Sequence, residues 1–482
     1  MMSKLSARPT ACWASIIPSM IRSIFTYLLA IACAALPALS SQNATPESFL
    51  PGSVIPRVVT AANSEQSYAL YLPSHYSKDR PWPILYIFDP MARGEHALQQ
   101  FQHAAEAQGF VVAASNNSRN GAWAPQAQAA EAMLDDTQSR FAVDLKRIYF
   151  AGFSGGARVS ARLAQLCKCA AGVILSGAGF SDASPPSADS AFPVFSAVGD
   201  ADFNYPEILR LQDTLQKASF PRWLRIFPGA HQWAPPEVMD EALAWFRVLS
   251  VNTNLEPRND AFVAGQFAEA KGRAARYEAS GDLLSALREY RQIAGTFSSL
   301  DSVAETRAKV DALEKDKAVR DAAKRERNDF EEQERMTQEV FAPPANVRSD
   351  DANRTDTAIR AEAAHQTLDL IRALRSRAQS EKKPERARIL QRALAGIFVS
   401  SVESGENAFE KKDYSVAVQN YACAAEANPQ ADWIQRELAV ARALSGDRKG
   451  ALKALTAARD RAKDKNEFQE WLRQQPSLPP LQ

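Results

Sequence analysis

The chain has few of the residues that mark specialised protein classes. Five cysteines in 482 residues exclude a disulfide scaffold. Its 20 glycines and 27 prolines are too few for a collagen-like or low-complexity chain. The net charge of +1 argues against nucleic-acid binding through a strongly basic surface. With 46% hydrophobic and 23% charged residues, the composition is that of ordinary globular protein.

Long hydrophobic runs are also missing. The charge-free stretch 24–36 has thirteen residues, short of the roughly 20 that a membrane-spanning helix needs. Arg22 precedes it and small residues follow at 38–40, so we expect residues 1–40 to be a secretory signal peptide. The alternatives are a lipoprotein signal ending at a lipidated Cys33 and an uncleaved anchor. All three predict an exported chain, periplasmic or extracellular. If the segment is cleaved, a lipid at Cys33 is the one membrane attachment that we expect could remain.

Three cysteines follow this segment: Cys167, Cys169 and Cys423. Because three is odd, at least one thiol is unpaired or pairs between chains. Cys167 and Cys169 are too close in sequence for an easy disulfide. We expect them to be two small buried residues.

Residues 53–250 alternate apolar runs with helical patterns. Several runs are apolar on both faces, which predicts a doubly wound, mostly parallel α/β sheet covered by helices. The short segment 180–192 leaves no room for a large lid. The expected strands are 68–72, 84–88, 110–114, 148–151, 172–175, 194–198 and 223–227, and the expected helices are 97–107, 126–141, 157–166, 206–218 and 236–250.

From residue 255 onward the strand pattern stops, and we expect an all-α region. Residues 301–340 hold 21 charged residues of both signs, which is typical of a long solvated helix. The expected parts are a helical region over 255–340 with one repeat-like unit, a linker over 341–356, a second helical region over 357–473 and a tail over 474–482.

Part of the second helical region repeats with a period of 34 residues. Ala417 recurs as Ala451, and Tyr421 recurs as Leu455. This pattern resembles the tetratricopeptide repeat, which pairs two helices in about 34 residues. The resemblance implies a surface that docks a protein or peptide partner. The alternative is a helical appendage that packs only on itself or on the α/β domain.

A serine motif lies where the α/β pattern turns from strand to helix. Residues 152–156 (GFSGG) form a G-x-S-x-G around Ser154. A serine nucleophile needs a basic side chain, and His231 is the one histidine of five that lies after Ser154 within the α/β region. The orienting carboxylate then comes from Asp200 or Asp202, which follow the strand 194–198.

Over residues 53–250 the chain resembles the α/β-hydrolase superfamily. It is most similar to esterases of the feruloyl-esterase, polyhydroxybutyrate-depolymerase and dienelactone-hydrolase type. In that family the acid is usually the last residue of a G-x-x-D run, which favours Asp202 over Asp200. The resemblance implies a Ser154, His231 and Asp202 triad.

The oxyanion hole needs two backbone donors. Gly155, which follows the nucleophile, supplies one N–H group. The second donor should follow the strand 84–88, and because Pro90 has no N–H, we expect Met91. Relatives usually carry His-Gly where this chain has Asp89-Pro90, so the chain departs from the pattern of that family at the oxyanion hole.

Candidate substrate contacts lie beside the expected triad. Asn116, Asn117 and Trp123 lie in or just after a polar loop at the carboxyl end of a strand, while Phe203 and Trp233 flank Asp202 and His231. The alternative for the loop is that its Asn and Ser side chains satisfy their own backbone. We expect no metal or other cofactor, because metal-binding and phosphate-loop motifs are missing.

These features predict an exported serine hydrolase that cleaves small carboxylic esters through an acyl-enzyme. The helical half would dock a protein or peptide partner, and no nucleic acid is expected to bind. The alternative is a catalytically weak hydrolase-fold protein that acts through its repeats at the cell envelope. Acyl transfer to an acceptor other than water has the same sequence signature as hydrolysis.

Overall fold

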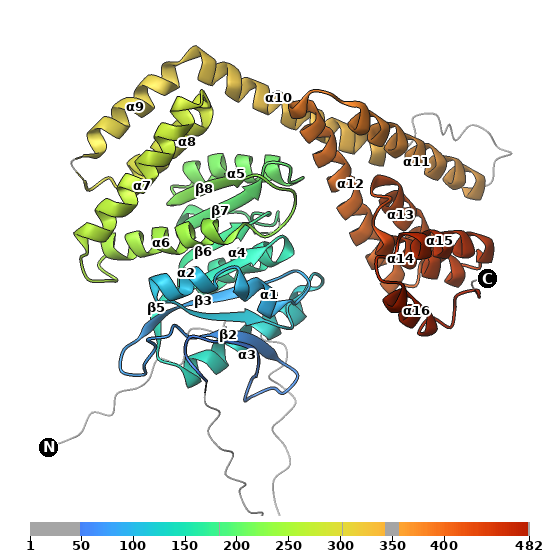
Figure 1. Ribbon diagram of the computed structural model, residues 1–482, viewed down its shortest axis with the longest axis horizontal. Coiled ribbons are helices and arrows are strands. Elements are labelled where there is room, and N and C mark those ends of the chain that lie inside the picture. The colour runs from blue at the N-terminus through green and yellow to red at the C-terminus, as the bar shows by residue number, and fades with distance from the viewer. Residues whose placement is uncertain (1–48, 183, 301, 343–355, 481–482) are drawn as a thin grey trace, which may run out of the picture.

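The computed structural model describes residues 49–182, 184–300, 302–342 and 356–480. The expected signal segment and most of the expected linker lie outside these residues. Along the described chain, a sheet with helices on both faces is followed by helices alone (Figure 1). The predicted fold class, a mostly parallel α/β domain followed by an all-α region, is confirmed.

Eight strands form one sheet in the order β1-β2-β4-β3-β5-β6-β7-β8. Strands β3 to β8 pair in parallel, and β1 and β2 add an antiparallel edge. The long strand β5 lies near the middle and is followed directly by a helix. The strands are β1 (Val54–Val59), β2 (Ser67–Tyr71), β3 (Trp82–Phe88), β4 (Val111–Ser115), β5 (Val143–Phe153), β6 (Ala170–Ser176), β7 (Val194–Gly199) and β8 (Arg222–Phe227).

Helices cover both faces of the sheet because strand side chains alternate between them. In β3, Leu85 and Ile87 join one core with α1, α2 and α6, while Tyr86 and Phe88 join the other with α3, α4 and α5. These helices are α1 (Gly94–Gln99), α2 (Gln102–Gln108), α3 (Trp123–Arg140), α4 (Gly155–Cys167), α5 (Tyr205–Lys217) and α6 (Pro236–Asn252).

The α/β pattern differs from the sequence-based expectation at two places. Strand β1 was not predicted, because exposed Pro56 and Arg57 interrupt its apolar pattern. Proline is tolerated there because β1 is the edge strand. The expected helix 97–107 is divided into α1 and α2.

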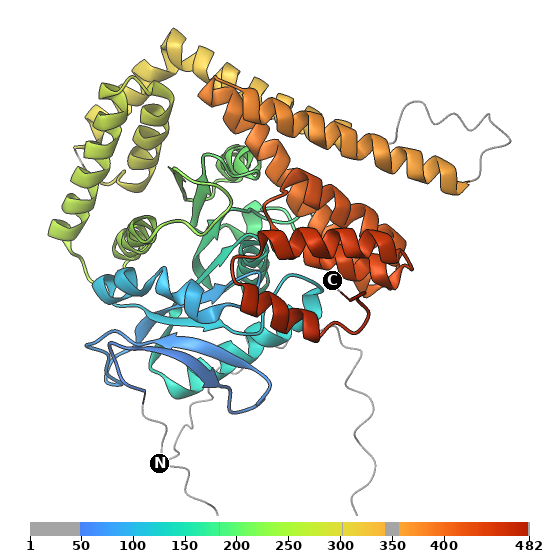
Figure 2. The ribbon, with the colours of Figure 1, turned by 45° about the vertical axis from the view of Figure 1, so that its right-hand side comes forward.

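The second half arches over the β8 edge of the sheet and then descends beside it (Figures 1 and 2). Both views show α12 descending from beside α10 to α13. Within the described part of the chain, no helix is both long and apolar enough to span a bilayer. The helices are α7 (Asp260–Ala279), α8 (Leu283–Thr296), α9 (Val303–Lys315), α10 (Lys317–Phe341), α11 (Asp356–Ser380), α12 (Pro384–Glu410), α13 (Tyr414–Ala427), α14 (Asp432–Leu444), α15 (Arg448–Arg461) and α16 (Lys465–Arg473).

The charged segment 301–340 is two helices rather than one long helix. Asp316 separates them, because its carboxylate accepts hydrogen bonds from the N–H groups of Ala318 and Val319 and so begins α10. One side of α10 is buried, including Val319, Phe330, Met336 and Val340. The helix therefore packs against other elements and is not solvated all round.

In three helix pairs, α7–α8, α12–α13 and α14–α15, an aspartate begins the second helix. Asp282, Asp413 and Asp447 each accept a hydrogen bond from the backbone N–H three residues later. The residue before each aspartate has a positive φ, which ends the preceding helix. These residues are Gly281 (φ 80°), Lys412 (φ 61°) and Gly446 (φ 90°).

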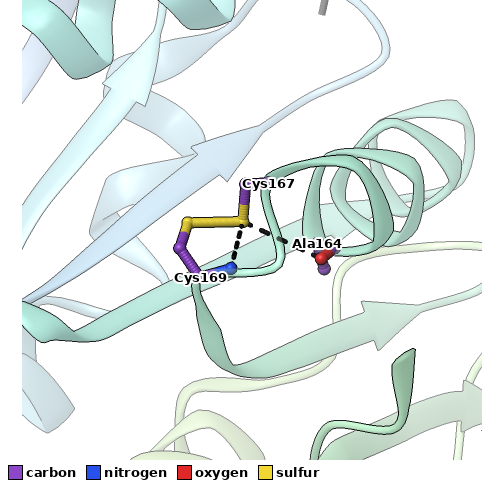
Figure 3. Close-up of a disulfide and its surroundings, with 3 residues drawn as sticks. All are labelled: Ala164, Cys167 and Cys169. Carbon is purple, nitrogen blue, oxygen red and sulfur yellow. Dashed lines mark hydrogen bonds between the residues drawn. A yellow bond between two sulfur atoms is a disulfide. The ribbon is translucent and has the colours of Figure 1, made fainter. Parts of the chain in front are cut away.

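Cys167 and Cys169 form a disulfide, so the expectation of two free buried cysteines is wrong (Figure 3). Lys168 between them has a φ of 51°, and this left-handed turn leaves the two Cα atoms 5.1 Å apart. That separation lies within the usual range for a disulfide. Among the described cysteines, Cys423 is free and buried.

Candidate active site

Ser154 lies at a sharp turn between β5 and α4. Its φ is 52°, a conformation that side chains seldom adopt and that points to strain at a functional position. The flanking glycines are required by close packing. A Cβ on Gly152 would lie 2.1 Å from the carbonyl oxygen of Gly156, and a Cβ on Gly156 would lie 2.0 Å from that of Phe88.

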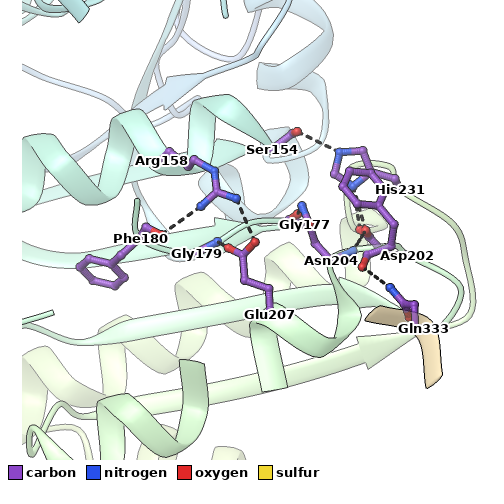
Figure 4. A network of polar contacts seen from close by, with 11 residues as sticks. Ser154, Arg158, Gly177, Gly179, Phe180, Asp202, Asn204, Glu207, His231 and Gln333 are labelled. Carbon is purple, nitrogen blue, oxygen red and sulfur yellow. Dashed lines mark hydrogen bonds and ion pairs between the residues drawn. The ribbon is translucent and has the colours of Figure 1, made fainter. Parts of the chain in front are cut away.

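The structure brings Ser154, His231 and Asp202 together (Figure 4). The Nε2 atom of His231 lies 2.9 Å from Ser154 Oγ, and its Nδ1 atom lies 2.9 Å from both carboxylate oxygens of Asp202. Asp202 is fully buried, whereas the His231 side chain is 16% exposed. With the proton on Nδ1 held by Asp202, Nε2 is free to accept the serine proton.

The two candidate carboxylates have different partners. Asp200 points away from the imidazole: its Oδ1 accepts from the Gly229 N–H at 3.1 Å, and its Oδ2 lies 2.8 Å from Arg388 Nη1. The geometry therefore pairs Asp202 with His231 and leaves Asp200 to join neighbouring segments.

Two phenylalanine rings hold the imidazole of His231. The ring centroids of Phe203 and Phe153 lie 4.4 and 4.6 Å from it. Phe203 was predicted as a substrate contact, and it lies beside the triad. Packing from both rings restricts the rotation of the imidazole, which keeps Nε2 directed at Ser154.

Residues 89–91, the segment that we expect to supply the second oxyanion donor, differ from the expectation at Met91. The Met91 N–H donates to Asp89 Oδ1 at 2.9 Å, so it is engaged and does not stand free as the expected second donor. Asp89 is buried and also accepts hydrogen bonds from Arg93 and Trp233. Burial raises the pKa of Asp89, but these hydrogen bonds outweigh it and hold the pKa below its ordinary value.

Gly155 begins α4, where backbone N–H groups have no partner within the helix. The Asn120 side chain lies directly against it, because a Cβ on Gly155 would be 1.8 Å from Asn120 Oδ1. We did not predict Asn120 from the sequence. Its position in the polar loop after β4 was the available signal, but nothing separated it from its neighbours there.

Other predicted substrate contacts have structural partners instead. Asn116 donates to the Pro56 carbonyl, and Asn117 bonds the Ser67 N–H and the Glu65 carbonyl. These side chains join the loop to the β1–β2 edge, so they satisfy backbone groups of another segment rather than those of the loop itself.

The two predicted tryptophans are also packed against protein. The Arg162 guanidinium lies over the Trp123 ring, with its Cζ atom 4.0 Å from the ring centroid. Trp233 is buried, packs on Phe101 and donates from Nε1 to Asp89. The structure therefore does not place either ring as a free wall beside Ser154.

No protein-family model matches the sequence, and no curated protein matches it. Among solved structures, the chain is similar to a substrate-bound fluorophosphonate-binding serine hydrolase of Staphylococcus aureus at 17% identity and a TM-score of 0.35, over 41% of this chain and 98% of that one. A hyperthermophilic esterase of Pyrobaculum calidifontis matches at 12% identity and a TM-score of 0.35, over 42% of this chain and 87% of that one. The S-formylglutathione hydrolase of S. aureus matches at 15% identity and a TM-score of 0.33, over 41% of this chain and 97% of that one.

Proposed function

We propose that this protein is a serine hydrolase that cleaves carboxylic esters through an acyl-enzyme. The observation that carries the proposal is the continuous chain of hydrogen bonds from the Ser154 hydroxyl through the His231 imidazole to the Asp202 carboxylate. It lies at a strained strand-to-helix turn, where the serine hydroxyl is presented at the start of a helix.

In the proposed reaction each triad residue has a defined part. Ser154 Oγ attacks the ester carbonyl carbon while His231 Nε2 takes the serine proton. Asp202 holds Nδ1–H and stabilises the imidazolium that forms. The imidazolium then gives its proton to the leaving alkoxide, and the acyl group stays on Ser154. Water, deprotonated by His231, then attacks the acyl carbon. The bond from that carbon to Ser154 Oγ breaks, the carboxylic acid leaves, and His231 returns the proton to the serine.

Negative charge on the substrate oxygen develops next to the start of α4. The Gly155 N–H and the positive end of the helix dipole stabilise that charge. Because the Met91 N–H is engaged with Asp89, the second donor is weakened in this conformation. An alkoxide leaves more readily than an amine anion, so esters are the substrates that suit this site.

Hydrolysis of a short aryl ester, such as p-nitrophenyl acetate, tests the proposal. We expect Ser154→Ala to lower kcat by about 10⁴-fold or more, as the loss of a triad member does elsewhere. Ser160→Ala is the matched control, because Ser160 lies on α4, the helix that follows Ser154, and its hydroxyl donates to the Gly156 carbonyl. Wild-type protein without turnover, or Ser154→Ala with full turnover, would refute the proposal.

The engaged Met91 N–H favours a second candidate function. In this alternative the hydrolase domain is catalytically weak, and the helix pairs bind a partner at the cell envelope. A burst of p-nitrophenol without sustained turnover would support it. Steady turnover of the ester would count against it.

We also propose that the chain is exported and that its helix pairs dock a protein or peptide. The charge-free stretch 24–36 supports export, and so does the Cys167–Cys169 disulfide, because disulfides persist in oxidising compartments. The paired helices and their 34-residue period support docking. Acyl transfer is separated from hydrolysis by adding an alcohol acceptor and measuring the ester formed.

A further inference from the structure

The loop that carries Asp202 is held by helices from the far half of the chain. We call residues 199–205, which run from the last residue of β7 to the first residue of α5, the acid loop. Within the α/β domain it is hydrogen-bonded to the segment before His231: the N–H groups of Asp200 and Ala201 donate to the carbonyls of Phe227 and Gly229. These bonds fix one side of the loop.

Helix α10 holds the acid loop next to the catalytic carboxylate. Gln333 Nε2 donates to the carbonyl oxygen of Phe203, the residue after Asp202, at 2.9 Å (Figure 4). Gln333 is buried, so water competes little for this bond. The Tyr205 hydroxyl, at the end of the loop, donates to Glu326 on the same helix at 3.0 Å.

Helix α12 holds the loop on the other side of Asp202. Arg388 forms an ion pair with the Asp200 carboxylate at 2.8 Å, and Arg392 lies 3.4 Å from the Asp200 carbonyl oxygen. Gly396, one turn further, lies against the Phe203 side chain, which would be 3.5 Å from a Cβ at that position. Residues on both sides of Asp202 are therefore held by α10 and α12.

Phe203 links α12 to His231, the proposed catalytic base. Its ring lies between α12 and the imidazole of His231. A displacement of α12 would thus reach both partners of the Asp202–His231 pair, Asp202 through its loop and His231 through the ring. The same helix packs against α13 at its other end, where Gly405 contacts Tyr421.

We infer that Gln333 and Arg388 are positioning residues for the Asp202–His231 pair, so that the helical half completes the active site. The inference rests on the proposed function, and it assigns α10 and α12 a part in the reaction. Neither residue touches the reacting atoms. Their contribution is to keep the carboxylate aligned with Nδ1, which matters most in the transition state, when the imidazole is charged.

Steady-state kinetics on the full chain test the inference. We expect Gln333→Ala to lower kcat about three- to tenfold with KM changed less than about twofold, because a buried hydrogen bond is lost but no substrate contact is. Arg388→Ala should lower kcat about threefold, and Arg388→Lys should restore most of it. The control is Glu334→Ala: Glu334 lies beside Gln333 on α10 but pairs with Arg210 on α5.

Hydrogen–deuterium exchange of the acid loop gives a readout that does not depend on activity. The N–H groups of Asp200, Ala201, Asp202 and Tyr205 are hydrogen-bonded, so they should exchange faster in Gln333→Ala than in Glu334→Ala. Unchanged kcat and unchanged exchange in both Gln333→Ala and Arg388→Ala would overturn the inference, and so would equal losses in Glu334→Ala. If the wild-type protein is inactive, the proposed function fails and the exchange rates still decide the inference.

Discussion

Asp89 shows how one buried carboxylate organises the segments that surround it. Its buried carboxylate accepts hydrogen bonds from Arg93 and from Trp233, which lies two residues after His231. It also holds the Met91 N–H. Asp89 thus joins two loops of the candidate site.

We predict that Asp89→Asn lowers the free energy of unfolding by about 2 kcal/mol at pH 7, because charged hydrogen bonds to Arg93 and Trp233 are lost. The folded pKa of Asp89 lies below its ordinary value of 3.8. The stability that its charge contributes is therefore present above pH 3.8 and is lost as the pH falls through the lower folded pKa.

Denaturant unfolding at pH 7 and near pH 3 checks this prediction. The difference between wild type and Asp89→Asn should be large at pH 7 and should shrink in acid. Asp79→Asn, at an exposed position, is the control and should change stability by less than about 0.5 kcal/mol. Equal stability of Asp89→Asn and wild type at pH 7 would contradict the account.

Single residues also show what a sequence can reveal. Ser154 follows from a motif with a steric cause, and His231 follows because few histidines compete for its role. The roles of Asn116 and Asn117 could not be predicted, because their partners lie about 50 to 60 residues away on another edge of the sheet. Local sequence does not encode such contacts.

Among the elements, the helix pairs share one joint: a left-handed residue followed by a capping aspartate. Two of the three joints have glycine before the aspartate, whereas the third has Lys412 with a φ of 61°. A lysine in this conformation is strained because its Cβ approaches the following carbonyl oxygen. Glycine there avoids the strain but loses more entropy on folding.

We predict that Lys412→Gly raises the free energy of unfolding by about 0.5 kcal/mol, the net of these two effects. Lys412 is exposed, so little packing is lost. The reciprocal change Gly446→Lys, where φ is 90°, should lower stability by about 1 kcal/mol. The midpoint of urea unfolding measures both. A lower midpoint for Lys412→Gly would show that strain at this joint is not significant.

Element prediction failed where a pattern was weak or a cap was overlooked. The edge strand β1 was missed because exposed Pro56 and Arg57 hide its alternation. The break between α9 and α10 had a visible signal in Asp316, a good helix N-cap, but the continuous charge pattern suggested one helix. Buried strands were predicted well, since their apolar runs have a single physical explanation.

For the whole molecule, the two halves are connected more closely than the sequence indicates. The contacts of Gln333 and Arg388 with the acid loop join residues 130 and 188 positions apart. No periodicity or motif marks them, because each is an ordinary polar residue on a helix surface. Only the folded arrangement of α10 and α12 reveals that they contact the acid loop on both sides of Asp202.

The most direct test of the central claim is labelling with a fluorophosphonate probe, mapped by mass spectrometry. The account predicts rapid labelling of Ser154 in the wild type and its loss in His231→Ala. His103→Ala is the matched control, because His103 also pairs with an aspartate, Asp240 at 2.9 Å, but is exposed and remote in sequence from Ser154. It should label like the wild type. An unlabelled wild type, or equal labelling of His231→Ala, would contradict the account.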